Sequence, residues 1–173
     1  RCFESDKITD VNSKINPVED LETIKTEIIL SDIDIIQKKL EKGKKKLLEE
    51  KQIKILEEKL EQLNKGKEII SNDELEKKFL STLGLLSIKP KIIVCNVDEE
   101  SLVKGNSFTN EVKKKYSGDK IVTICADIED QIMDLDNNER ETFMKEIGLN
   151  KTGLNQLIKE GYELLNLDTF FTS

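Results

Sequence analysis

The 173-residue sequence has no histidine and no tryptophan, only two tyrosines and three cysteines. Without histidine, Ser-His and Cys-His nucleophile pairs and His-containing zinc sites are excluded. The scarcity of aromatic rings argues against a platform that stacks the bases of single-stranded nucleic acid. The cysteines show no C-x-x-C spacing, and Cys95 and Cys125 lie in apolar runs, which favours a reducing, cytosolic compartment.

Long apolar runs are also missing. No stretch reaches the roughly 20 apolar residues of a membrane span and no secretory signal opens the chain, so we expect no membrane association. The sequence begins at Arg1 rather than Met, which predicts a piece of a longer protein. The net charge of −7 hides an asymmetry, because residues 37–67 carry eleven Lys and six Glu, a balance of +5 that leaves −12 elsewhere. The positive charge therefore belongs to one segment.

That basic segment lies in a helical pattern. Asn16 and Pro17 form a helix-start signal. Apolar residues then recur at helical spacing over 21–47 and 53–63, with a break at Gly43. Two antiparallel amphipathic helices packed as a short coiled-coil hairpin explain this pattern. Ser71 and Glu74 have the spacing of a capping box, which predicts the start of a further helix.

Two short apolar runs, 92–95 and 121–125, are typical of strands buried on both faces of a parallel sheet. Helical patterns alternate with them, which indicates an α/β fold with a parallel sheet. Residues 96–99, Asn-Val-Asp-Glu, follow the first run, where open α/β sheets bind ligands. The alternative is that Asn96 or Asp98 only caps the turn or the next helix.

Five separated segments, at 1–4, 16–20, 95–99, 125–129 and 161–172, carry a family resemblance. In order and spacing the sequence resembles the YchF (Obg-like ATPase) subfamily of the Obg P-loop NTPases, essentially from end to end. The resemblance implies the C-terminal part of a P-loop NTPase parallel sheet. Residues 1–26 and 71–162 would belong to the nucleotide-binding (OBG-type G) domain, 27–70 to an inserted helical hairpin, and 163–173 to the entry of a truncated TGS domain.

The resemblance also implies a purine site. Guanine-specific relatives read the base with N-K-x-D, whose Asp accepts two parallel hydrogen bonds from guanine. A longer Glu99 in that place should not reproduce this geometry. By resemblance ATP is preferred over GTP, Asn96 shapes the pocket, and the Val97 carbonyl accepts from the adenine 6-amino group, while Asp98 points outward. The remaining base-contact candidates are Cys125 and Ala126 in a second loop, and Phe3, which is otherwise a core residue at a strand end.

The phosphate-binding half of such a site is missing. No G-x-x-x-x-G-K-[ST] motif occurs in the sequence. We expect ATP or GTP hydrolysis with Mg²⁺ by the parent protein, and no activity from these residues alone, which offer no catalytic group and no metal ligand. Asp127, Glu129 and Asp130 are interpreted as acids in the first turn of a helix, where they complement its dipole.

The basic hairpin has two interpretations. In the first, its lysines belong to a solvated surface. In the second, they contact rRNA phosphates, and this binding does not depend on sequence and shows no DNA specificity. The lysines are Lys42, Lys44, Lys45 and Lys46. The association of the family with ribosomes agrees with the second. The sequence therefore leaves two function classes: part of a cytoplasmic, ribosome-associated P-loop ATPase, or a non-enzymatic RNA-binding or ribosome-binding module that acts through the hairpin.

Overall fold

The computed structural model describes residues 1–5, 14–43, 48–71 and 73–168. Its helices and strands are, in chain order, α1 (Pro17–Gly43), α2 (Glu50–Asn64), α3 (Glu74–Ser81), β1 (Ile92–Asn96), α4 (Glu99–Lys104), α5 (Ser107–Lys115), β2 (Lys120–Ile124), α6 (Ala126–Met133), α7 (Asn137–Glu146) and α8 (Gly153–Leu164). The chain divides into two compact units. The sheet unit comprises Arg1–Glu19 and Pro90–Ser173, and the helical unit comprises Asp20–Lys89.

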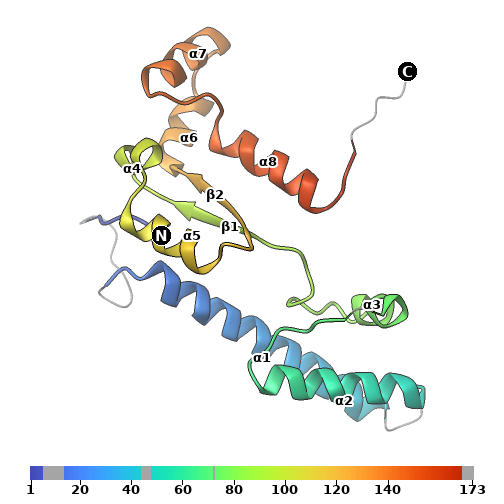
Figure 1. The fold of residues 1–173 in the computed structure, drawn as a ribbon. Coiled ribbons are helices and arrows are strands. Elements are labelled where there is room, and N and C mark those ends of the chain that lie inside the picture. The colour runs from blue at the N-terminus through green and yellow to red at the C-terminus, as the bar shows by residue number, and fades with distance from the viewer. Residues whose placement is uncertain (6–13, 44–47, 72, 169–173) are drawn as a thin grey trace, which may run out of the picture. The chain divides into compact units, whose positions relative to one another are not determined.

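The sheet unit is built on two parallel strands. Their register places Ile92 beside Lys120 and Asn96 beside Ile124, so both carboxyl ends lie at the same edge of the sheet. The chain passes from β1 to β2 through α4 and α5, and α6 starts directly where β2 ends (Figure 1). The helix α8 packs against β2. The predicted mixed α/β architecture with a parallel sheet is confirmed.

One expectation about β1 was wrong. Its residues were predicted to be buried on both faces, yet Val94 is 42% exposed, whereas the next residue, Cys95, is 2% exposed. This alternation is that of a strand covered on one face, because successive side chains point to opposite sides of a sheet. In β2 the central residue, Val122, is fully buried.

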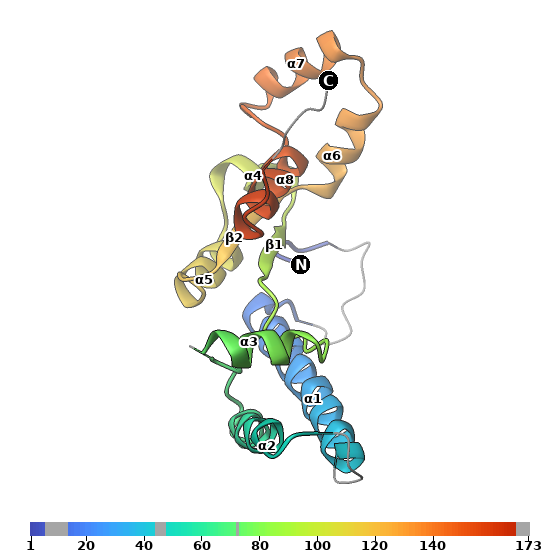
Figure 2. The same cartoon turned by 90° about the vertical axis from the view of Figure 1, so that its right-hand side faces the viewer.

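The helical unit contains the predicted pair of amphipathic helices, with α2 running back beside α1 and α3 next to them (Figures 1 and 2). Its core consists of Ile29, Ile36, Leu40, Leu56, Leu63, Ile69, Leu80 and Leu85. Because Leu80 and Leu85 join this core, the unit reaches beyond the inserted segment 27–70 expected from the sequence. Among the described residues no helix is both long and apolar enough to cross a membrane.

The start of α3 differs from the prediction. The cap is Asp73 and not Ser71: the Asp73 carboxylate accepts hydrogen bonds from the backbone N–H groups of Leu75 and Glu76, at 2.8 and 3.0 Å. The Ser71 hydroxyl instead donates to the Asp73 carbonyl. Asp73 is the N-cap because it directly precedes the first turn of α3. Its negative charge there also interacts favourably with the helix dipole. These two hydrogen bonds lower the pKa of Asp73.

Two buried charged side chains fix the helical unit. Asp32 on α1 is fully buried, and its carboxylate accepts from the backbone N–H groups of Leu86 and Ser87, both at 2.8 Å. Lys59 on α2 is 3% exposed, and its ammonium lies 2.7 Å from a Glu76 carboxylate oxygen. Burial by itself lowers the pKa of Lys59, but its hydrogen bonds to glutamate outweigh burial and raise it.

Candidate functional site

The carboxyl ends of β1 and β2 are joined by two hydrogen bonds. The Asn96 side-chain oxygen Oδ1 accepts from the backbone N–H of Ala126 at 3.0 Å. The backbone N–H of Val97 donates to the Ile124 carbonyl at 2.8 Å. Cys125 is buried between these contacts, at the N-cap position of α6. The structure therefore brings together four of the predicted base-contact residues, Asn96, Val97, Cys125 and Ala126.

The roles of residues 96–98 are distinct. Asn96 caps the first N–H of α6 from the neighbouring strand instead of capping the helix that follows it in sequence. Val97 is 2% exposed, so its side chain belongs to the core. Asp98 caps α4, because its carboxylate accepts from the Ser101 backbone N–H at 2.8 Å. The capping alternative predicted for Asp98 is confirmed, and its carboxylate is occupied locally.

Phe3 is placed by the residue before it. The backbone N–H of Cys2 donates to the Asn96 carbonyl at 2.8 Å, and the Asn106 side-chain amide donates to the Cys2 carbonyl at 2.6 Å. These bonds hold residues 1–3 against the end of β1. The Arg1 guanidinium lies 5.6 Å from the centre of the Phe3 ring. The contribution of Asn106 was missed, although an Asn in front of Ser-Phe-Thr is a helix-cap signal, and Asn106 does cap α5.

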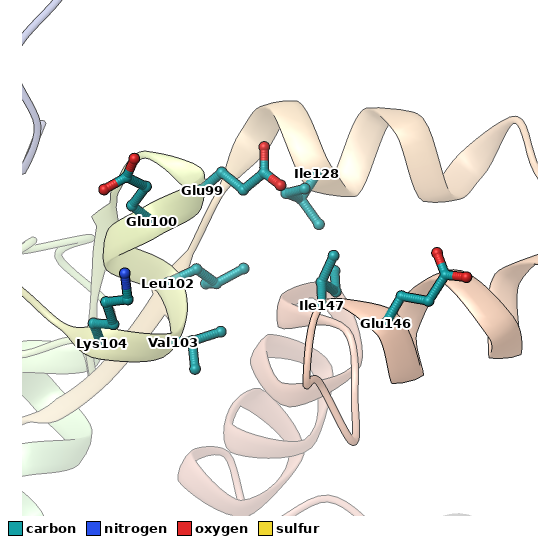
Figure 3. A pocket seen from close by; sticks show the side chains of 8 residues that line it. All are labelled: Glu99, Glu100, Leu102, Val103, Lys104, Ile128, Glu146 and Ile147. Carbon is teal, nitrogen blue, oxygen red and sulfur yellow. The ribbon is translucent and has the colours of Figure 1, made fainter.

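Glu99, the first residue of α4, belongs to a different surface. It lines a pocket of about 570 Å³ together with Glu100, Leu102, Val103, Lys104, Ile128, Glu146 and Ile147. In Figure 3 its side chain extends from α4 toward Ile128 of α6. The other five predicted base-contact residues are not part of this wall. Besides burial, the negative charge of Glu99 helps to raise the pKa of Cys125, so Glu99 lies near that second loop as well.

Glu129 does more than begin a helix. It lies in the first turn of α6, as predicted, but its carboxylate also accepts from the backbone N–H groups of Gly153 and Leu154, at 2.6 and 3.2 Å. A Cβ atom at Gly153 would lie 2.6 Å from Ile124 Cγ2, so only glycine fits at the start of α8. These contacts fix α8 next to the end of β2 and were not foreseen from the sequence.

The predicted RNA-contact lysines are only partly described. Lys42 is exposed in the last turn of α1. Lys44, Lys45 and Lys46 lie outside the described residues. Within the part of the chain that the structure describes, no group of three or more acidic, cysteine or histidine side chains is arranged to hold a metal ion.

The sequence matches no family model. Over its whole length the chain is 38% identical to the ribosome-binding ATPase YchF of Escherichia coli O157:H7 and 33% identical to that of Bacillus subtilis (strain 168). The chain is a homologue of these YchF proteins over its whole length. The family resemblance predicted from the five segments is confirmed. The chain spans about half the length of the curated YchF relatives it matches.

A solved YchF structure supports the fold. The YchF GTPase of Schizosaccharomyces pombe superimposes on 95% of this chain with a TM-score of 0.82, and the chain covers 48% of that protein. The sequence identity in this comparison is 23%, so the likeness concerns the fold. The chain therefore has the fold of the corresponding half of a YchF protein.

Proposed function

We propose that this chain supplies the base-recognising part of a nucleoside triphosphatase that binds and hydrolyses ATP in preference to GTP and associates with ribosomes in the cytoplasm. Residues 1–26 and 71–162 are then part of its nucleotide-binding domain, 27–70 its inserted hairpin and 163–173 the entry to a TGS domain. The names of the relatives, ribosome-binding ATPases, support the activity and the partner. The observation that carries the base preference is the hydrogen bond from Ala126 to Asn96.

This bond disfavours guanine. Guanine presents an acceptor, O6, and two donors, N1–H and the 2-amino group. The Ala126 N–H that would meet O6 already donates to Asn96. The carboxylate that would accept from the two donors is missing as well, because Asp98 caps α4 and Glu99 extends toward Ile128. A buried polar group left without its partner costs about 1–3 kcal/mol, so guanine loses affinity at both edges.

The same arrangement suits adenine. Its 6-amino group is a donor and needs an acceptor, which the backbone carbonyl of Val97 supplies in our proposal. The Asn96 amide nitrogen, which has no hydrogen bond within the described residues, is left to donate to a ring nitrogen. Phe3 packs beside the base. Mg²⁺ would enter with the triphosphate, whose phosphates find no phosphate-loop motif in these 173 residues.

Calorimetric titration of the purified full-length parent protein with ATP, GTP and inosine triphosphate in the presence of Mg²⁺ tests the base preference. We expect ATP to bind at least about ten-fold more tightly than GTP, which corresponds to about 1.4 kcal/mol. Inosine shares O6 and N1–H with guanine but lacks the 2-amino group, so it should bind as weakly as GTP if the 6-position decides. Equal or reversed affinities for ATP and GTP would overturn the proposal.

The exposed end of α1 supports the ribosome contact. Lys39 and Lys42 have no ion pair among the described residues, whereas Lys38 pairs with Asp34 one helical turn away. Unpaired ammonium groups are the ones that attract phosphates, because paired lysines are already neutralised. The end of α1 therefore offers two ammonium groups to phosphates, beside the exposed carboxylate of Glu41, without base-reading side chains.

Replacing Lys39 and Lys42 by Glu should reduce co-sedimentation of the protein with ribosomes at least about five-fold at low salt, because each lost phosphate contact weakens binding. The control is the Lys77→Glu, Lys78→Glu variant, which changes the charge of the same unit by the same amount on α3. Equal sedimentation of both variants and the parent would favour a purely solvated hairpin.

A further inference from the structure

Two of the cysteines lie against each other at the end of β1. The side chains of Cys2 and Cys95 are hydrogen-bonded, and each residue is 2% exposed. Their backbones are fixed as well, since Cys2 donates to the Asn96 carbonyl and accepts from the Asn106 side chain, at 2.8 and 2.6 Å. Both are thiols rather than half-cystines. The thiol pair is therefore held in place by contacts on both sides.

The chemistry of this pair differs from that of the third cysteine. The hydrogen bond from Cys2 lowers the pKa of Cys95 against the opposing effect of burial, with smaller help from the positive charges of Lys113 and of the Arg1 amino group. For Cys125 burial dominates and raises the pKa. The thiolate is the nucleophile in disulfide exchange. The thiolate is thus favoured at Cys95 and disfavoured at Cys125, and because Cys95 is 2% exposed the oxidant reaches it only when residues 1–3 move off the end of β1.

We propose that Cys2 and Cys95 form a dithiol site that glutathione disulfide converts reversibly into a Cys2–Cys95 disulfide. The Cys95 thiolate attacks one sulfur of glutathione disulfide, whose S–S bond breaks and releases one glutathione thiolate. The Cys2 thiol then gives up its proton and attacks the Cys95 sulfur, which releases the second glutathione. The two cysteines lose two electrons in total, and one glutathione disulfide is reduced to two glutathione molecules.

The position of the pair links it to the base site. Cys95 directly precedes Asn96, and Cys2 directly precedes Phe3. Closing a disulfide brings the two sulfur atoms to about 2.05 Å and fixes the Cys2 and Cys95 side chains in one geometry, which constrains the two backbone segments that carry them. Asn96 follows Cys95 in the chain, its carbonyl accepts from the Cys2 N–H, and its side chain accepts from the Ala126 N–H. Oxidation should therefore displace Asn96 and weaken ATP binding, a consequence that rests on the proposed function.

Peptide mapping tests the disulfide itself. The purified protein is equilibrated with glutathione disulfide, quenched in acid, alkylated, digested and analysed by mass spectrometry. We expect a peptide pair joined through Cys2 and Cys95, with Cys125 recovered as an alkylated thiol, and full reversal by dithiothreitol. The Cys125→Ser variant should give the same pair. If the wild-type protein gives no Cys2–Cys95 peptide pair, or gives pairs that contain Cys125 instead, the proposal is wrong. This outcome does not depend on any variant.

ATP titration of the reduced and oxidised protein tests the link to the base site. We expect the oxidised protein to bind ATP at least five-fold more weakly and dithiothreitol to restore the affinity, with the Cys2→Ser variant insensitive to glutathione disulfide. Unchanged affinity in a protein whose disulfide has been mapped would overturn the link. If neither form binds ATP, the proposed function fails, and the disulfide is still decided by the peptide map.

Discussion

Replacing Asp32 by alanine is expected to lower the free energy of unfolding by about 2–4 kcal/mol, because one buried and one partly buried backbone N–H group lose their acceptor, at a cost of about 1–3 kcal/mol for a buried group. Asp32 is fully buried, and both of its hydrogen bonds, to the N–H groups of Leu86 and Ser87, are 2.8 Å long. These bonds join α1 to residues more than fifty positions away, so no local contact replaces them.

Urea unfolding followed by far-UV circular dichroism measures this effect. The matched control is Asp34→Ala, two residues further along the same helix, where the side chain is 59% exposed and, among the described residues, forms an ion pair with Lys38. That change should stay within about 0.5–1 kcal/mol, as surface ion pairs do. Asp32→Asn keeps one accepting oxygen and should fall between the two. A loss below about 1 kcal/mol for Asp32→Ala would mean that water replaces the carboxylate and that the site is not sealed.

Asp32 also shows what the sequence did and did not reveal. The spacing of apolar residues predicted α1 and α2, because burial of one helix face leaves a periodic trace. Asp32 lies on that same face, three residues after Ile29 and four before Ile36, both buried. A charged residue within an apolar stripe is a signal of a buried polar contact. Its partners could not be named, because they come from a distant loop.

In the candidate site, too, local contacts could be predicted from the sequence, whereas contacts between distant residues could not. The cap formed by Asp98 is a contact across three residues and was among the predicted alternatives. The bond from Ala126 to Asn96 spans 30 residues and the bond from Gly153 to Glu129 spans 24, so both depend on strand register and helix placement. Sequence spacing does not encode such distances. The family resemblance supplied the grouping of Asn96 with Ala126, and the structure added the atoms that join them.

Asn96 has two roles in our proposal: its side-chain oxygen accepts from the Ala126 N–H, and its amide nitrogen donates to adenine. Replacing Asn96 by aspartate removes the second role and keeps the first. The Asn96→Asp variant retains an oxygen for the Ala126 N–H but replaces the amide nitrogen, the proposed donor to adenine, by a negatively charged acceptor. We expect its stability to stay within about 1 kcal/mol of the parent, because the hydrogen bond to Ala126 survives. Its affinity for ATP should fall at least about ten-fold, since a donor to the base is lost and a charge is added.

Calorimetry and urea unfolding of three variants complete the comparison. Asn96→Ala removes both roles, so it should lose ATP affinity and also about 1–2 kcal/mol of stability. Asn110→Asp, on the exposed face of α5, introduces the same charge away from the site and should change neither quantity. If Asn96→Asp binds ATP as the parent does, Asn96 acts only as a cap on α6, and recognition of the base must rest on backbone groups. Loss of affinity with intact stability instead makes the amide nitrogen the reader of the base.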